Sequence, residues 1–229
     1  MKPLIESPGI LRFVRTIFFY GVFTSLVARS EPDLSLENLF PGDRLVEVQI
    51  SLSSSDWDNL RNQSRNFMEA LSPQRRTSPP PTPYEYVPAK VTIDGVTFQK
   101  VGLRKKGFLG SQDTTRPSLK IKLDLFEAGQ EIDGLKTLTL NNNKQDITLM
   151  NQYLGYRIFD QAQSPGSRCG FAKVTVNGTN LGVYAHVESV KRPLLKREFG
   201  DDSGSLYEGT VVDFFKGWEQ SFELKKGDA

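Results

Sequence analysis

The sequence is poor in the side chains that most often bind metals or act as nucleophiles. Its 229 residues include one cysteine, Cys169, and one histidine, His186. These counts exclude an intrachain disulfide, a CxxC pair, a Cys/His zinc site and an HExxH helix. A Ser-His-Asp or Cys-His arrangement would have to be built around His186, and no Ser or Asp motif accompanies that residue. Any chemistry therefore rests on carboxylates, Lys, Arg, hydroxyl groups and the backbone.

The overall charge does not indicate a class of binding partner, because 29 Lys and Arg residues nearly balance 27 Asp and Glu residues for a net charge of +2. A hydrophobic fraction of 38% and an aromatic fraction of 10% are sufficient for a packed core. The length predicts one domain or slightly more. No aromatic residues alternate with the cations in a ladder, so we expect no nucleic-acid partner.

The first thirty residues have the features of a secretory signal peptide. A basic flank precedes the thirteen mostly apolar residues 16–28, and Ala28-Arg29-Ser30 supplies a small-x-small cleavage pattern before Glu31. The apolar run is shorter than the ~20 residues that span a bilayer, so we predict no transmembrane span. We expect removal of residues 1–30 and a secreted, cell-envelope or surface location; the alternatives are an uncleaved anchor or a wrongly assigned start of the reading frame.

Residues 31–44 form a polar lead-in, and strands and short helices are predicted after it. Alternation and hairpin turns predict strands at 45–52, 86–93, 96–104, 118–125, 135–140, 171–176, 181–188 and 205–208. Apolar stripes and caps predict helices at 54–71, 147–161 and 190–199, and a proline-rich surface loop is expected at 72–83. This order predicts an α+β protein with a mostly antiparallel sheet and inserted helices, rather than a doubly wound fold.

One segment concentrates positive charge. Between residues 100 and 122 there are seven cations and a single anion, Asp113. Side chains alternate along a strand, so Arg104 shares a side with Lys106, and Lys120 shares a face with Lys122. If the two strands pair, Arg104 and one of Lys120 and Lys122 can hold phosphate oxygens. The alternative is an ordinary solvated strand face.

Two further features accompany this segment. The turn from Gly107 to Ser111 offers backbone N–H groups that an anion can contact. On the strand 181–188, Glu188 is a candidate ion-pair partner for Lys120 or Lys122, and the alternative is an ordinary cross-strand or exposed charge. The segment contains neither a Walker loop nor a GxGxxG motif. Cys169 is expected to be inert.

Several blocks resemble the CotH family, which is named for a spore coat protein and described as protein-kinase-like. They are Arg104-Lys-Lys-Gly107 with Ser111, Pro117–Asp124, Gly134–Asn143 with Asp146, Leu149–Phe159, Phe171–Glu188 and Lys196–Tyr207. The blocks occur in the family's order and cover roughly residues 45–225, which makes the resemblance more specific than any single motif.

The resemblance implies a secreted or surface protein with an atypical protein-kinase-like fold. Such a protein binds ATP with Mg²⁺ or Mn²⁺ and transfers phosphate to Ser or Thr of a protein acceptor. It further implies that Arg104 and Lys120 or Lys122 contact the phosphates, and that Glu188 pairs with the lysine. Asn143 and Asp146 match the family block, although a role in a turn and a helix cap explains them equally well.

The family pattern continues beyond residue 229 into a helical lobe that supplies the catalytic Asp and the metal-binding carboxylate. The domain 45–229 is therefore expected to be incomplete at its carboxyl end, with a truncated second lobe. No catalytic residue or metal ligand is assigned, and we expect this chain alone to be inactive. The alternative function is a non-catalytic envelope or surface module that binds a protein partner.

Overall fold

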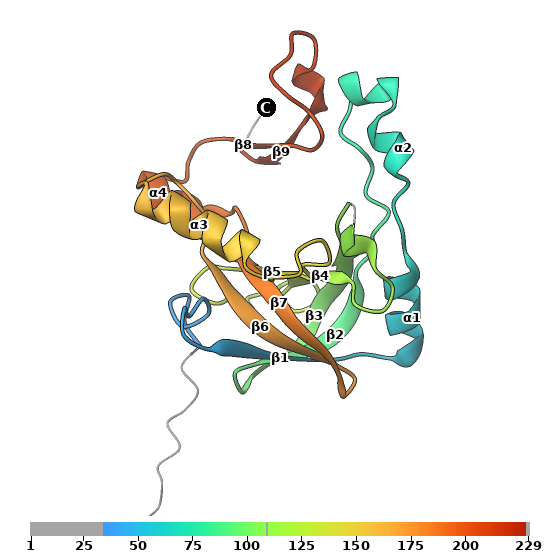
Figure 1. The fold of residues 1–229 in the computed structure, drawn as a ribbon, viewed down its shortest axis with the longest axis vertical. Helices are drawn as coiled ribbons and strands as arrows, with labels where there is room; N and C mark the ends of the chain where they lie inside the picture. The colour runs from blue at the N-terminus through green and yellow to red at the C-terminus, as the bar shows by residue number, and fades with distance from the viewer. Residues whose placement is uncertain (1–33, 109, 228–229) are drawn as a thin grey trace, which may run out of the picture. The chain divides into compact units, whose positions relative to one another are not determined.

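The computed structural model describes residues 34–108 and 110–227, so the predicted signal peptide lies outside the described residues. Strands are the commonest regular element in the described residues (Figure 1). The strands are β1 (Leu45–Ser51), β2 (Val87–Ile93), β3 (Val96–Lys106), β4 (Ser118–Lys122), β5 (Thr137–Asn141), β6 (Cys169–Val176), β7 (Thr179–Glu188), β8 (Leu206–Gly209) and β9 (Phe222–Lys226). The helices are α1 (Ser54–Asn62), α2 (Phe67–Ala70), α3 (Asn151–Gln161) and α4 (Arg192–Phe199), with 3₁₀ turns at Pro73–Arg76, Gly110–Gln112 and Glu219–Ser221.

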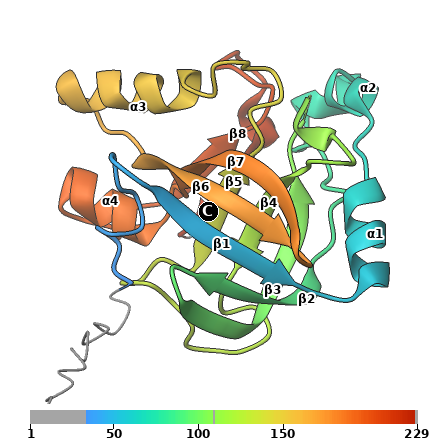
Figure 2. The same ribbon diagram turned by 60° about the horizontal axis from the view of Figure 1, so that its bottom comes forward.

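The first seven strands close into a barrel in the order β1-β2-β3-β4-β5-β7-β6 (Figure 2). Every neighbouring pair is antiparallel except β1 and β6, which run parallel with Leu45 opposite Phe171. The predicted α+β class and mostly antiparallel sheet are confirmed. Closure into a barrel was not predicted, because it depends on pairing between two strands that lie far apart in the sequence.

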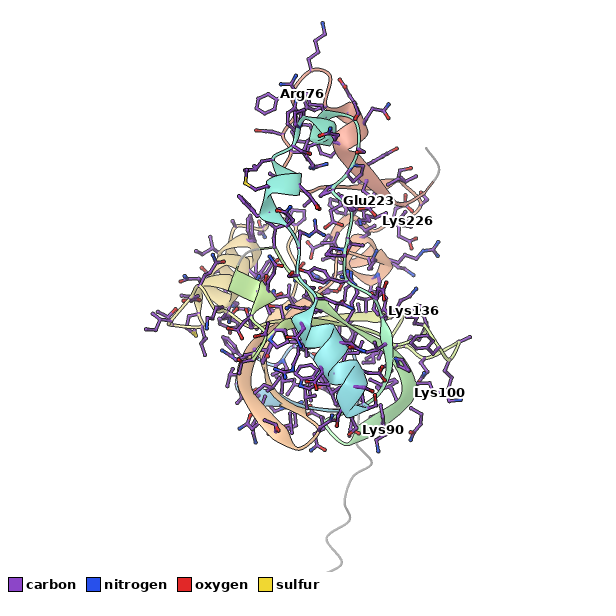
Figure 3. The ribbon with its side chains drawn as sticks, turned by 90° about the vertical axis from the view of Figure 1, so that its right-hand side faces the viewer. Arg76, Lys90, Lys100, Lys136, Glu223 and Lys226 are labelled. Carbon is purple, nitrogen blue, oxygen red and sulfur yellow. The ribbon has the colours of Figure 1, made fainter. Side chains whose placement is uncertain are left out.

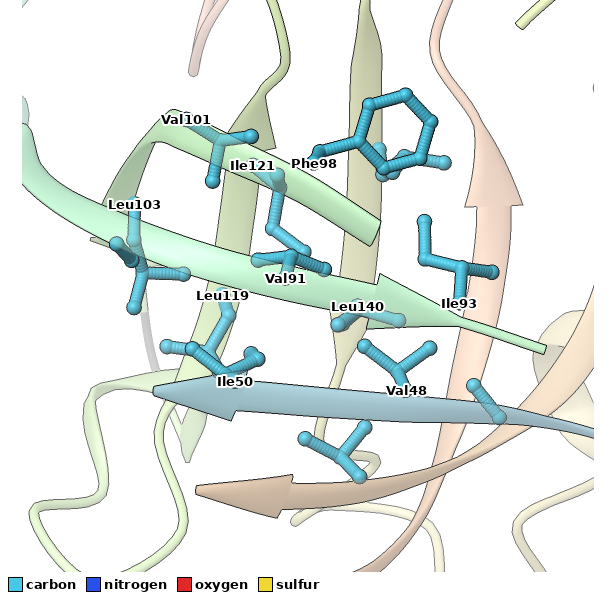
Figure 4. Packing of buried hydrophobic residues seen from close by; sticks show 14 of the residues in the cluster. Val48, Ile50, Val91, Ile93, Phe98, Val101, Leu103, Leu119, Ile121 and Leu140 are labelled. Atoms are coloured by element: carbon cyan, nitrogen blue, oxygen red, sulfur yellow. The ribbon is translucent and has the colours of Figure 1, made fainter. Parts of the chain in front are cut away.

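The barrel interior holds the hydrophobic core (Figure 4). Along β1, Val46, Val48 and Ile50 are buried while the residues between them are exposed. The same alternation on neighbouring strands contributes Val91, Ile93, Leu103, Leu119, Ile121, Leu138 and Leu140 to the cluster. Burial of each such side chain stabilises the fold by about 1.5–3 kcal/mol relative to its exposed state. The inward residues fix the barrel and leave the alternate residues facing outward.

The helix predicted over 54–71 is shorter in the structure. Ser53 caps α1 by accepting a hydrogen bond from the N–H of Asp56, and Leu60 is its buried residue. The chain becomes extended at Gln63 (φ −60°, ψ 141°), and Asn66 then caps the four-residue α2. The prediction was wrong beyond Asn62 because the apolar side chains that follow do not pack as one stripe; Leu71 is 55% exposed.

One helix boundary and one additional strand also differ from the sequence prediction. Asp146 was expected to cap a helix starting at Ile147, but α3 begins at Asn151. The Asp146 carboxylate accepts hydrogen bonds from the N–H groups of Thr148 and Asn151, and Leu149 adopts a left-handed conformation (φ 61°) that ends the intervening turn. Strand β9 was not predicted, and it pairs with β8 in a separate two-stranded sheet.

Within the described ranges, none of the helices combines the length and hydrophobicity needed to cross a bilayer.

Candidate functional site

The register of the barrel brings the predicted cations of β3 and β4 together. Arg104 lies directly opposite Lys120, and Lys106 lies opposite Ser118. Directly opposite residues on neighbouring strands share one face of a sheet. Their neighbours Leu103 and Ile121 face the core, so Arg104 and Lys120 project outward. The two strands therefore pair, which was the condition for Arg104 and a lysine of β4 to share a ligand.

This outer face forms one wall of a cavity of about 1000 Å³. We refer to this space as cavity 1. It is lined by Arg104, Lys106 and Lys120 from the barrel, by residues 79–82, by the turn at Gly107, by residues 141–146, and by Glu208, Glu223 and Lys225 from β8 and β9. Segments that are distant in the sequence thus face the cations found by sequence analysis. A cavity of this size can enclose a ligand as large as a nucleotide.

Two tyrosines position the guanidinium of Arg104. Its carbon atom lies 5.3 Å from the ring centroid of Tyr86 and 6.0 Å from that of Tyr84. The Tyr84 hydroxyl donates a hydrogen bond to the carbonyl of Gly107 (2.9 Å), which ties this ring to the following turn. Arg104 forms no ion pair with a carboxylate among the described residues. Aromatic faces therefore orient a charge that an anion can still approach.

Lys106 and Lys120 in the wall of cavity 1 are partly desolvated, and neither forms an ion pair with a carboxylate among the residues described. Burial, followed by the nearby charge of Arg104, lowers the pKa of Lys106 to about 8. Burial, followed by Arg104 and Lys191, likewise lowers the pKa of Lys120 to about 8, and the charge of Glu208 partly opposes the lowering of both pKa values. Lys106 Nζ donates to Asn141 Oδ1 at 2.7 Å, whereas the ammonium group of Lys120 forms no hydrogen bond or ion pair with a described residue. An anion bound here would offset the repulsion among these groups.

The sequence left open whether Lys120 or Lys122 accompanies Arg104. Lys120 lines cavity 1, whereas Lys122 lies two residues further along β4 and lines only a second cavity of about 860 Å³. Lys106 was not among the predicted site residues, although its position two residues after Arg104 on the same strand face was the available signal.

The predicted ion pair between Glu188 and a lysine is wrong. Glu188 lies opposite Leu138, and Leu138 lies opposite Ile121, so all three side chains face inward. The Glu188 carboxylate is fully buried and contacts the guanidinium of Arg197 on α4. It also accepts a hydrogen bond from the N–H of Arg168 at 3.0 Å. Alternation within one strand could not reveal which of its faces adjoins the face of β4 that carries Lys120.

The side chain of Ser111 stabilises the turn after β3. Gly107 has φ +123°, and Ser111 Oγ accepts the N–H of Phe108 at 3.0 Å. That N–H is therefore engaged within the turn. Asn143 also has a positive φ (51°), and its amide nitrogen donates to the carbonyl of Leu149 at 3.2 Å. A turn-and-cap role thus accounts for Asn143 and Asp146.

The remaining chemically notable side chains are structural. His186 is 1% exposed and lies 4.5 Å from the ring of Phe40; burial lowers its pKa to about 4. Burial raises the pKa of the Cys169 thiol to about 12, so the thiol stays protonated. Sequence analysis missed the buried Lys105, whose Nζ donates to the carbonyl of Arg61 at the end of α1 (2.6 Å).

Candidate metal ligands are few in the described part of the chain, which holds no group of three or more His, Cys, Asp or Glu side chains able to bind an ion. Glu208 and Glu223 face each other across β8 and β9 and both line cavity 1. Lys225 pairs with both carboxylates, lying 3.1 Å from Glu208. Protein-bound Mg²⁺ commonly takes one or two carboxylates together with substrate phosphates, and this pair fits that requirement.

The barrel and its cation-lined cavity define an α+β protein with a candidate site for a phosphate-bearing anion. A family profile described as "CotH kinase protein" matches residues 103–228, which include both strands that carry the cations. The chain therefore belongs to the CotH family, as its sequence blocks predicted. A relative from Bacillus subtilis (strain 168), named "Inner spore coat protein H-like protein", is 31% identical over 102 residues. That match covers 42% of this chain and 33% of the relative, so the chain corresponds to about a third of that protein's length.

Proposed function

We propose that this chain is the nucleotide-binding part of a CotH-type, protein-kinase-like phosphotransferase. In this proposal the phosphates of ATP lie in cavity 1. Arg104 offers a planar fork to phosphate oxygens, and Lys106 and Lys120 act as point charges. Transfer to Ser or Thr of a protein acceptor would also need a catalytic Asp from a further lobe, as the resemblance implies. The name of the Bacillus subtilis relative supports a spore-coat or other surface location for the chain.

One observation carries the proposal: Arg104, Lys106 and Lys120 line one cavity without an ion-pair partner among the described residues. Cations gathered on one strand face repel one another, and burial weakens their hydration. Charge-assisted hydrogen bonds to a triphosphate would offset both penalties. A purely solvated strand face, which was the alternative interpretation, does not need a cavity around its cations.

Mg²⁺ or Mn²⁺ fits this proposal through Glu208 and Glu223, which line the wall of cavity 1 contributed by β8 and β9. These carboxylates would hold the ion together with phosphate oxygens. A divalent ion bound there neutralises charge on the phosphates. Lys225, which pairs with both carboxylates, would have to release them to the ion. Lys122 and Glu188, which the resemblance also implicated, lie outside this set.

The test is isothermal titration of the full chain with ATP and Mg²⁺ or Mn²⁺. The wild type is compared with Lys120→Ala and with Lys100→Ala, a matched removal of an exposed lysine elsewhere on β3. We expect at least about tenfold weaker binding for Lys120→Ala, since a charge-assisted hydrogen bond is worth about 1.5–3 kcal/mol. Lys100→Ala should bind as the wild type does. No binding by the folded wild type, or equal affinity in all three proteins, would overturn the proposal.

A second candidate function is a non-catalytic module that binds a protein partner. It is favoured by the aromatic residues between β8 and β9, where Phe214 is 91% exposed and Phe215 is 60% exposed. Nucleotide titration separates the two candidates, because the module requires no ATP affinity. Incubation with labelled ATP and metal, followed by detection of protein-bound phosphate, shows whether this chain also transfers phosphate.

A further inference from the structure

The second cavity adjoins cavity 1 and shares Lys120 with it. We refer to this space of about 860 Å³ as cavity 2. Its walls come from the outer face of β4, the β4–β5 connection, the first turns of α4, and β8 and β9. Tyr86, Pro193 and Leu206 add apolar surface to a lining that is otherwise mostly charged.

Cavity 2 has more cations than its own carboxylates neutralise. Four of its basic side chains have partners: Lys136 with Asp124 (3.2 Å), Arg192 with Asp202 (3.6 Å), Lys225 with Glu208 (3.1 Å), and Lys226 with the carbonyl of Gly204 (3.0 Å). The side-chain ammonium groups of four lysines form no ion pair or hydrogen bond with a described residue, namely those of Lys120, Lys122, Lys191 and Lys196.

The carboxylates of cavity 2 have partners of their own. Asp124 and Glu131 lie near Lys136, and Asp202 lies near Arg192. Asp133 accepts the backbone N–H of Leu36 at 2.7 Å. The surplus of positive charge is therefore local, although the whole chain carries only +2. Three of the four lysines are half-buried in the wall of the cavity, and Lys196 is exposed at its edge.

We propose that cavity 2 binds an acidic segment of the polypeptide that accepts the phosphate. This proposal rests on the proposed function and specifies its substrate class: a Ser or Thr flanked by Asp or Glu. Carboxylates of the segment would lie against Lys122, Lys191 and Lys196, and its apolar side chains against Tyr86 and Leu206. Because Lys120 belongs to both cavities, a segment held in cavity 2 would place a hydroxyl beside the phosphates in cavity 1.

The electrostatics of the site agree with an anionic occupant. Lys191 is one of the positive charges that disfavour protonation of Lys120 and lower its pKa. The two cavities therefore interact through their cations, and a segment of negative charge would relieve repulsion in both. Mixed aliphatic and aromatic surface between the lysines suits peptide side chains better than a phosphodiester backbone, which presents charge at regular intervals.

The test measures fluorescence anisotropy of labelled peptides with the full chain, saturated with a non-hydrolysable ATP analogue and Mg²⁺. Three peptides of equal length carry one Ser flanked by Glu, by Gln or by Lys. The test variant combines Lys191→Glu with Lys196→Glu. The control variant combines Lys90→Glu with Lys100→Glu, which change the net charge equally on β2 and β3; Figure 3 labels both lysines at a distance from Lys226. Lys191 precedes the first residue of α4, where an acidic side chain is well tolerated.

We expect the Glu peptide to bind more tightly than the Gln peptide, and its affinity to fall about tenfold in the test variant but not in the control variant. The Lys peptide should gain affinity for the test variant. The inference would be overturned if the Glu and Gln peptides bound equally, or if both variants weakened binding of the Glu peptide equally. It would also be overturned if the nucleotide analogue displaced the Glu peptide, or if a single-stranded oligonucleotide bound more tightly than that peptide. Binding of the nucleotide analogue alone is measured in a separate titration. The chain can therefore lack a preference for the Glu peptide and still have the proposed ATP site.

Discussion

Arg104 on β3 and Lys120 on β4 lie directly opposite each other on the outer face of the barrel. Like charges in directly opposite positions destabilise a pair of strands. Neither side chain forms an ion pair with a described carboxylate, and the more distant Glu208 offsets only part of the repulsion on Lys120. An anionic ligand shared by the two cations would explain why they lie side by side.

Replacing Lys120 by Met should stabilise the free protein and weaken nucleotide binding. Met keeps much of the aliphatic stem but removes the charge that faces Arg104. We expect the free energy of unfolding to rise by about 0.2–1 kcal/mol, as measured by urea denaturation. Loss of stability together with unchanged ATP affinity would contradict the assignment of Lys120.

Affinity for ATP should fall as pH rises through about 8. Burial lowers the pKa of both Lys106 and Lys120 to about 8. The folded protein therefore loses these two charges at lower pH than the unfolded chain, whose lysines titrate near 10.4. Between these values the unfolded state binds more protons, so the penalty for burying the ammonium groups is relieved as pH rises. The free fold gains stability from these groups over the same window in which the site loses its charge.

The pH dependence has an internal control. Lys120→Arg keeps its charge throughout this range, because the guanidinium pKa exceeds 12. ATP affinity of this variant, measured by titration from pH 7 to 9.5, should vary less steeply than that of the wild type. Identical pH profiles for the two proteins would show that Lys120 is not a titrating ligand of the phosphates.

Glu188 should matter for stability and not for nucleotide affinity. Its buried carboxylate contacts Arg197 and accepts the N–H of Arg168. Glu188→Gln should lower the free energy of unfolding by about 1–3 kcal/mol. This loss is smaller than that for a fully buried ion pair, because both arginine side chains are about a third exposed. Titration with ATP below the unfolding transition should give the wild-type affinity. A selective loss of ATP binding at full stability would restore the role that the family resemblance implied.

Gly107 should not tolerate a side chain. Its φ of +123° is unfavourable for any residue with a Cβ, and a Cβ built there would lie 1.7 Å from Ser111 Oγ. Gly107→Ala should therefore shift the Ser111 turn and lower the free energy of unfolding by at least about 1 kcal/mol. Thermal unfolding monitored by circular dichroism measures the effect, with Gly129→Ala as a control for positive φ in open space. Equal loss in both variants would show that contact with Ser111 is unimportant.

Local patterns predicted the strands and the cations well, and they failed where the answer depended on distant pairing. Alternation alone placed Arg104 and Lys106 on one strand face. Closure of β1 onto β6, however, joins Leu45 to Phe171, and no short window of sequence contains that information. The position of Glu188 failed for the same reason, since its face is set by the register of β7 against β5. The second wall of cavity 1, with Glu208 and Glu223, required a strand that the sequence did not predict.

The most direct measurement of the central claim is an NMR titration of the lysine side-chain amines in the full chain, with and without ATP and Mg²⁺. We expect Lys106 and Lys120 to have pKa values of about 8 in the free protein, and nucleotide to raise both pKa values. Ammonium groups that titrate at the same pH with and without nucleotide would contradict the assignment of cavity 1 as a phosphate site.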